Sequence, residues 1–130
     1  MAEVSRTWIS STLATEFVSL AAAKATLEAT RTLEVPDHLQ RVGTRLLDGL
    51  RALAQEHPDV LSGVGGIPQM CFLQYADDSV SHAVTAACAQ SGLLFKRSAY
   101  NFVSLAHTET LVAHSLDLLA EALSAVAKPA

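Results

Sequence analysis

The sequence has 130 residues, of which 50% are hydrophobic and 17% charged, a balance that predicts an ordered globular piece and excludes a disordered tail. This length suffices for one hydrophobic core and is too short for two ordinary domains. The net charge is −4 and no basic run occurs, which argues against nucleic acid or an anionic membrane as a partner.

The first part of the chain is expected to be helical after an extended loop over residues 1–12. A helix over 13–31 follows, with large apolar side chains near one face: Leu13, Phe17, Leu20 and Leu27. Val35-Pro36-Asp37 breaks this helix, and Pro36 suits the first turn of a second helix that ends near His57. The second helix carries an apolar stripe at a spacing of three to four residues, made of Leu39, Val42, Leu46, Leu50 and Leu53.

The middle of the chain predicts two strands, over 60–66 and 70–75, joined by a hairpin or bulged turn at Gly65–Pro68. A helix is then expected from Val80 to about Ser91, capped at its start by Asp77-Asp78-Ser79 and ended by Gly92 in a left-handed conformation.

Two short strands, over 93–95 and 101–106, lead to the last predicted helix. Thr108 is its expected N-cap, Glu109 is favourable in its first turn, and its apolar residues run to Val126. Strands and helices in this order predict an α+β fold, with an antiparallel or mixed sheet of about four strands and helices packed on one side. We expect one domain over 1–130, in which 13–31 is a linking helix and 36–127 forms the α+β part.

The chain offers weak signals for a membrane, a disulfide or a metal. No stretch contains the about 18 apolar residues that a membrane span needs, and no secretory signal is visible, so a cytoplasmic protein is expected. Cys71 and Cys88 have the count and spacing of buried small hydrophobes rather than of a disulfide framework or a zinc site. None of the five histidines forms a metal-binding pair on a helix, so we predict no metal site.

Several polar residues admit both a structural and a functional interpretation. Ser10-Ser11-Thr12 precedes a helix and could bind a phosphate through hydroxyls, backbone N–H groups and the helix dipole, although such residues are usually helix caps. The adjacent carboxylates of Asp77-Asp78 favour a helix cap over a catalytic pair, since neighbouring residues in a turn point apart. His107 is expected to bond local backbone and fix the turn between the last strand and the last helix.

Three segments together carry a resemblance to a known family: the polar loop and alanine-rich helix from Ser10 to Leu27, Gly43-x-x-Leu46-x-x-Gly49-Leu50, and Phe102-Val-Ser-Leu-Ala-His-Thr-Glu109. In this order they resemble the C-terminal part of class III (fold type I) pyridoxal-phosphate (PLP) aminotransferases, most closely the glutamate-1-semialdehyde 2,1-aminomutase branch. The resemblance runs from about Trp8 to Val126 and corresponds to roughly the last third of such an enzyme, its small domain with the helix leading into it.

The resemblance implies that Thr12, with Ser11 beside it, contacts the phosphate of the PLP bound in the other subunit of a dimer. Family members often read Gly-Asn-Pro after this threonine, whereas this chain reads Ala14-Thr15-Glu16-Phe17, so the loop departs from the family pattern here while the threonine itself stays in register. Lys96-Arg97-Ser98 falls beside the active-site entrance of the aminomutases, where it could contact substrate or form a solvated edge.

The resemblance also implies that the lysine holding the cofactor lies upstream of these segments. Lys24, Lys96 and Lys128 are the lysines of this sequence, and none sits in the strand-end context of the family's Schiff-base lysine. We therefore expect no catalytic residue in this chain and no activity of the chain alone.

Two functions follow from the resemblance. The chain is either the C-terminal domain of a PLP aminotransferase or aminomutase acting on a small amino substrate, or a non-catalytic remnant that serves as a dimerising or binding module. In the first case it needs a partner chain carrying the large PLP domain. In either case it is expected to form a homo-oligomer or such a complex, because Leu13, Phe17 and Leu20 would otherwise expose an apolar strip.

Overall fold

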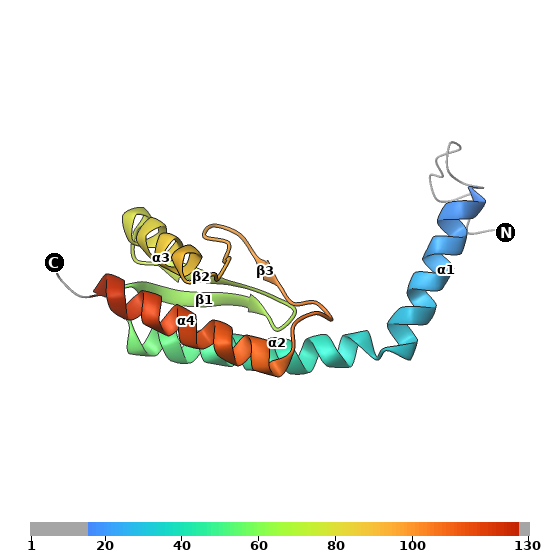
Figure 1. The fold of residues 1–130 in the computed structure, drawn as a ribbon, viewed down its shortest axis with the longest axis horizontal. Helices are drawn as coiled ribbons and strands as arrows, with labels where there is room; N and C mark the ends of the chain where they lie inside the picture. Colours follow the sequence, from blue (N-terminus) through green and yellow to red (C-terminus); the bar gives the residue numbers. More distant parts are fainter. Residues whose placement is uncertain (1–15, 128–130) are drawn as a thin grey trace, which may run out of the picture. The chain divides into compact units, whose positions relative to one another are not determined.

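The structure is a computed structural model that describes residues 16–127. The chain divides into two compact units, residues 1–35 and residues 36–130. Within the second unit, helices and a three-stranded sheet form an α+β fold, which confirms the predicted class with one strand fewer than expected (Figure 1).

In the described part of the first unit, residues 16–35, the chain forms helix α1 (Phe17–Thr32). The carboxylate of Glu16 caps its start by accepting hydrogen bonds from the backbone N–H of Val18 (3.0 Å) and of Ser19 (2.5 Å). These hydrogen bonds, led by those of Ser19, lower the pKa of Glu16. None of the residues of α1 is buried. The predicted helix is thus confirmed from Phe17 onward, and its first residues, 13–15, lie outside the described part of the chain.

Leu33 and Glu34 form the turn between α1 and α2 (Val35–Glu56). Glu34 stands between them with φ 48°, a left-handed conformation that is uncommon outside glycine. Pro36 lies in the first turn of α2 as predicted, because proline has no N–H to donate there. The predicted stripe is buried or partly buried along α2 and packs in the core.

Strands β1 (Leu61–Ile67) and β2 (Met70–Tyr75) form an antiparallel hairpin. The turn is at Pro68-Gln69, so the glycines predicted to form it lie within β1 instead. Gly66 has φ 103°, which explains why glycine is required at this position. A shift in register between Leu61 and Gly63 marks a bulge in β1.

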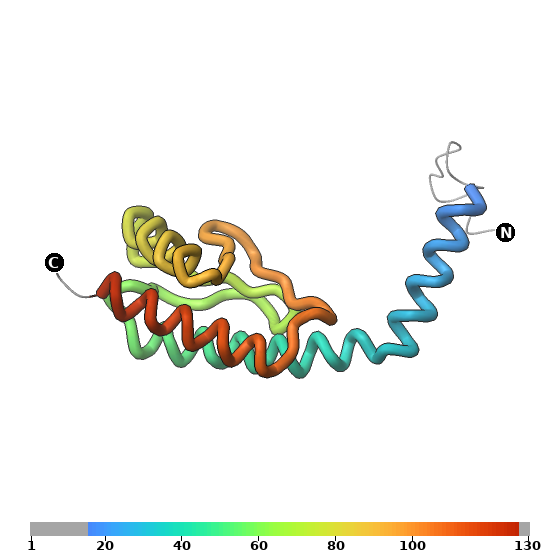
Figure 2. Tube along the Cα trace, viewed as in Figure 1, coloured from blue at the N-terminus to red at the C-terminus, as the bar shows by residue number. Residues whose placement is uncertain are grey.

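Helix α3 (Asp78–Gln90) begins slightly before the predicted start at Val80 and ends next to the predicted Ser91, and both predicted caps are present. The side chain of Asp77 accepts a hydrogen bond from the N–H of Val80 at 2.8 Å, and Gly92 has φ 83°. The strand predicted over 93–95 is wrong. In its place a loop runs back from α3 to β3 (Asn101–Phe102), and the N–H of Lys96 bonds the side chain of Asn101 rather than another strand (Figure 2).

Strand β3 is shorter than the predicted 101–106, because the chain turns directly after it. Val103 N–H still bonds the carbonyl of Gln69 at 3.1 Å, but His107 N–H bonds the carbonyl of Ser104 and closes a turn. Helix α4 (Glu109–Ala127) follows, and the predicted cap is confirmed, since the Thr108 hydroxyl oxygen accepts from Leu111 N–H at 3.1 Å.

The helices of the second unit lie on one face of the sheet, as predicted. Side chains of α2, α3 and α4 share one core with the inward residues of the strands, among them Leu50, Val84, Leu119, Leu123, Cys71 and Leu73. Helices α2 and α4 lie side by side beneath the hairpin in Figure 1. Gly49 makes this approach possible, because a Cβ there would collide with the side chain of Leu116.

The structure bears on two expectations drawn from composition, one about the cysteines and one about membrane spans. Cys71 and Cys88 are both buried and free, as predicted, and burial raises the pKa of each thiol. Contrary to expectation, α4 has the length and composition of a membrane span, the one such helix among residues 16–127. Its buried side chains, including Leu119 and Leu123, belong to the core of the α+β fold.

Candidate functional site

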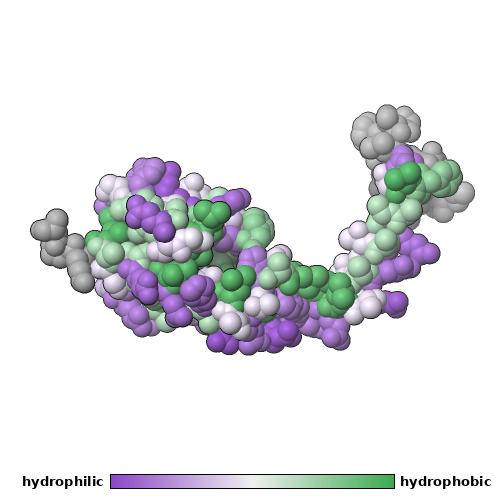
Figure 3. Space-filling model, viewed as in Figure 1, coloured by the Kyte–Doolittle hydropathy of each residue, from purple (hydrophilic) through white to green (hydrophobic). Residues whose placement is uncertain are grey.

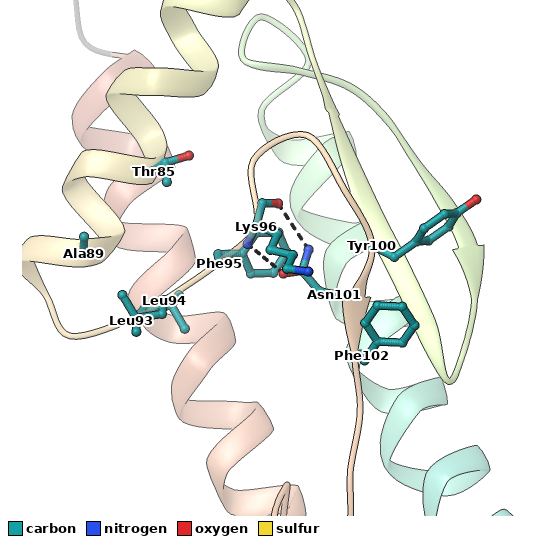
Figure 4. Close-up of a pocket in the computed structure, with 9 residues that line it drawn as sticks. All are labelled: Thr85, Ala89, Leu93, Leu94, Phe95, Lys96, Tyr100, Asn101 and Phe102. Atoms are coloured by element: carbon teal, nitrogen blue, oxygen red, sulfur yellow. Dashed lines mark hydrogen bonds between the residues drawn. The ribbon is translucent and has the colours of Figure 1, made fainter. Parts of the chain in front are cut away.

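A cavity of about 390 Å³ lies between α3 and the segment that returns from α3 to β3 (Figure 4). Its walls are mostly apolar and are formed by Thr85, Ala89, Leu93, Leu94, Phe95, Lys96, Tyr100, Asn101 and Phe102. The cavity is therefore walled by α3 on one side and, on the other, by β3 and the segment that contains the predicted strand over 93–95.

The side chain of Asn101 fixes the shape of this segment. Its Oδ1 accepts the N–H of Lys96 at 2.7 Å, and its Nδ2 donates to the carbonyl oxygen of Lys96 at 3.3 Å. The Lys96 ammonium lies 5.9 Å from the centroid of the Phe102 ring, within the range of a cation–π interaction. The Asn101 side chain thus closes the loop by bonding to the backbone of Lys96. This arrangement holds Lys96 at the rim of the cavity (Figure 4).

A second hollow, of about 300 Å³, adjoins the start of α3 and is lined in part by Arg97 and Ser98, which belong to the segment considered for substrate contact. The Arg97 guanidinium is ion-paired with Asp78 and donates to the Ser81 hydroxyl at 3.2 Å. Asp78 also lies 3.4 Å from the His82 ring. In this structure Arg97 is therefore partnered within the chain, and its side chain is 31% exposed.

The carboxylates of Asp77 and Asp78 have different partners, which confirms the interpretation of these residues as a helix start rather than a catalytic pair. Asp77 caps α3 and accepts a hydrogen bond from the Ser79 hydroxyl at 2.7 Å, whereas Asp78 pairs with Arg97. The hydrogen bond from Val80 N–H, followed by that from Ser79, lowers the pKa of Asp77.

His107 has the structural role that was expected. Its Nδ1 accepts the N–H of Ser104 at 3.0 Å and lies 2.9 Å from the Ser104 hydroxyl, while its carbonyl oxygen is 3.1 Å from Nε2 of His38 on α2. These contacts tie the turn before α4 to α2, close to the ion pairs of Glu109 with Arg41 (3.3 Å) and Arg45 (3.1 Å).

Ser11 and Thr12, the predicted phosphate ligands, lie outside the described residues. Within residues 16–127, no group of three His, Cys, Asp or Glu side chains could hold a metal ion.

Sequence reasoning missed the importance of Asn101, Tyr100 and Phe102. Asn101 was assigned only to a strand, and nothing in its spacing from Lys96 pointed to a bond between them. A signal for the aromatic residues did exist, since Phe72 and Phe102 fall on strands whose opposite side is also apolar. A strand with apolar residues on both sides is expected to be covered on both sides.

Comparison with known proteins places this geometry in a larger fold. No protein-family model matches the chain. Among solved structures, the chain is similar to the PLP internal aldimine form of the FumI protein of Sphingopyxis sp. MTA144, with 31% sequence identity and a TM-score of 0.76. The similarity covers 92% of this chain and 30% of the FumI chain, so this chain spans less than a third of the protein that it matches. The chain is therefore similar to one part of a protein that holds PLP as an internal aldimine.

Proposed function

We propose that this chain is the C-terminal small domain of a PLP-dependent class III aminotransferase or aminomutase, related to the glutamate-1-semialdehyde aminomutases. The observation that carries this proposal is the similarity to FumI, which extends over 92% of this chain at 31% identity. The order of elements from the alanine-rich α1 to the Phe102–Glu109 junction supports it, because the resemblance was carried by the same segments.

The described residues do not build a complete PLP site. Lys24 lies on α1 with its ammonium 3.9 Å from Glu28 and its side chain 77% exposed, and Lys96 extends over Phe102 at the rim of an apolar cavity. The cavity walls contain no carboxylate that could pair with the pyridine nitrogen of the cofactor. We therefore propose that the reactive lysine and its surroundings belong to a large domain, and that this chain alone is inactive.

The contribution of this chain to the assembled enzyme would be positional. Thr12 and Ser11 would contact the cofactor phosphate from the neighbouring subunit, as the resemblance implies. The Lys96–Ser98 segment would form one wall of the cleft for a small amino substrate. Its shape is set by the bond between Asn101 and Lys96 and by the ion pair of Arg97, so it would present a preorganised edge.

We also propose that the enzyme to which this chain belongs is cytoplasmic and forms a homo-oligomer. The homo-oligomer is supported by α1, whose apolar side chains are exposed in the absence of any other chain: Phe17 is 81% and Leu27 72% exposed. Figure 3 shows hydrophobic residues (green) among hydrophilic ones on the surface of α1. The same exposure favours the second candidate, a non-catalytic module that dimerises through this helix.

Absorbance spectroscopy separates the two candidates. PLP added to the chain alone should give no internal-aldimine band, because that band requires a lysine in a complete site. The band should form when this chain replaces the matching segment of FumI in a chimera. A chimera that folds, as judged by circular dichroism, but never forms the band would favour the non-catalytic module.

A further inference from the structure

Among residues 36–127, no helix covers one face of the sheet. The strand pairing sets Gly63 opposite Gln74, Gly65 opposite Phe72, and Met70 opposite both Ile67 and Phe102. Paired residues share a face, and the alternating residues Cys71 and Leu73 are buried in the core on the other side. We call the helix-free side the open face, formed by Gly63, Gly65, Ile67, Met70, Phe72, Gln74 and Phe102.

The open face has the composition of an interface rather than of a water-facing surface. None of its seven residues is charged, whereas the solvent-exposed face of an antiparallel sheet normally carries polar and charged residues. Ile67 is 50% and Phe102 61% exposed, and such contiguous apolar surface usually marks a contact with another protein surface.

Aromatic residues give the open face an ordered edge. The rings of Phe72 and Tyr100 meet edge to face with centroids 5.1 Å apart, and Tyr100 lies 6.4 Å from Phe102. The far end of the Phe72 ring lies over Gly65, where a Cβ would collide with it. The glycine in β1 thus leaves room for the aromatic side chain above the strand, and the result is an uncharged aromatic platform.

The comparison with FumI says what should cover this platform. This fold matches 30% of the FumI chain, so most of that protein lies outside the matched part and is available to cover the platform. The opposite face of the sheet is already filled by α2, α3 and α4. We propose that the open face is the docking surface for the PLP-binding remainder of the enzyme, with Phe72 and Phe102 as its anchors. This inference rests on the proposed function and adds to it the surface through which the two parts assemble.

Cysteine labelling tests the proposal without disturbing the core. Gln74 is exposed on β2 in the open face, and Ser124 is exposed on α4, so Gln74→Cys is the probe and Ser124→Cys the matched control. The native Cys71 and Cys88 are 0% and 1% exposed, so their reaction with a maleimide is slow and is measured on the unsubstituted protein. Each variant is labelled in the 130-residue chain and in the FumI chimera, and Phe102→Cys serves as a second probe.

Assembly should slow labelling of Gln74→Cys and Phe102→Cys by about tenfold or more in the chimera relative to the chain alone, and leave Ser124→Cys unchanged. Equal labelling rates at Gln74→Cys in a chimera that shows the aldimine band would overturn the inference and leave the proposed function standing. Protection without the band would support the docking surface and count against the proposed function. Protection in the chain alone that grows with protein concentration would mean that a second copy covers the face, which also overturns the inference.

Discussion

Asn101 is bonded to Lys96 twice, once as acceptor of its N–H and once as donor to its carbonyl oxygen. This side chain replaces the hydrogen bonds that a neighbouring strand would have provided to the segment after α3. It therefore explains both the missing fourth strand and the cavity beside it.

Removal of that side chain should loosen the loop. We expect Asn101→Ala to lower the free energy of unfolding by about 1–2 kcal/mol, because two hydrogen bonds to backbone are lost. Asn101→Asp keeps the acceptor for Lys96 N–H and should cost less. Urea denaturation measures both variants, and an unchanged midpoint for Asn101→Ala would show that the loop is held by its apolar contacts instead.

The two glycines of α2 should differ in their tolerance of a methyl group. A Cβ at Gly49 meets the flexible end of Leu116, so Gly49→Ala should destabilise by about 1–3 kcal/mol through overpacking. A Cβ at Gly43 meets the backbone carbonyl of Pro68, which cannot rotate away, so Gly43→Ala should cost more. Thermal unfolding ranks the variants. Leu116→Ala should suppress the effect at Gly49 and leave that at Gly43, and the reverse ranking would contradict this packing.

The N-terminal cap of α3 should make the stability of the folded protein depend on pH in the acidic range. The pKa of Asp77 is lower in the folded protein than in the unfolded chain, so its contribution is present above the unfolded pKa and is lost as the pH falls through the folded value. Asp77→Asn should therefore flatten the loss of stability at acidic pH, while Asp77→Ala should lower the melting temperature by about 2–4 °C at neutral pH. Melting curves between pH 2 and pH 7 (roughly the range that spans this titration) give both quantities. An acid response of Asp77→Asn identical to that of the native chain would assign the effect to another carboxylate.

Arg97 and Asp78 should be energetically coupled, though weakly. The Asp78 side chain is 78% exposed, and pairs of this kind contribute about 1 kcal/mol or less. A double-mutant cycle with Arg97→Ala and Asp78→Ala in urea should give a coupling of about 0.5–1 kcal/mol that falls with added salt. Additive losses from the two single variants would mean that Arg97 is free to serve another partner, such as a substrate.

The isolated chain should associate. Apolar side chains of α1 are exposed along the whole helix, and Phe17 and Leu20 were predicted from the sequence to form such a strip. Sedimentation velocity should find species larger than a monomer at high micromolar concentration, and Phe17→Ser combined with Leu20→Ser should shift them towards the monomer. Leu111→Ser on α4 is the matched control, since Leu111 is a 44% exposed apolar residue of the other unit. A stable monomer of the native chain would remove the support that α1 gives to an oligomer.

Local patterns predicted the helices of this protein well. The spacing of Val42, Leu50 and Leu53 defined the buried side of α2, and Asp77 and Gly92 marked the ends of α3, because periodicity and capping depend on neighbouring residues only. The sheet was predicted less well. The residues of the expected strand over 93–95 are apolar, but a strand needs a neighbour to bond, and β3 is only two residues long.

The candidate site was predictable only in part. The structural roles of His107 and Asp77 followed from their position beside a helix start. The contact of Asn101 with Lys96 and the aromatic cluster of Phe72 and Tyr100 depend on how distant segments fold back, which no spacing in the sequence encodes. The assignment of Thr12 and Ser11 to a phosphate stays a prediction.

The bulge near Gly63 has a consequence for solubility. Strand β1 is at the edge of the sheet, where unpaired backbone groups could recruit strands from other molecules into fibrils. An irregular, glycine-rich edge twists locally and offers a poor template for such growth. At high concentration this chain should therefore associate reversibly through its exposed apolar side chains rather than form fibrils with a cross-β diffraction pattern.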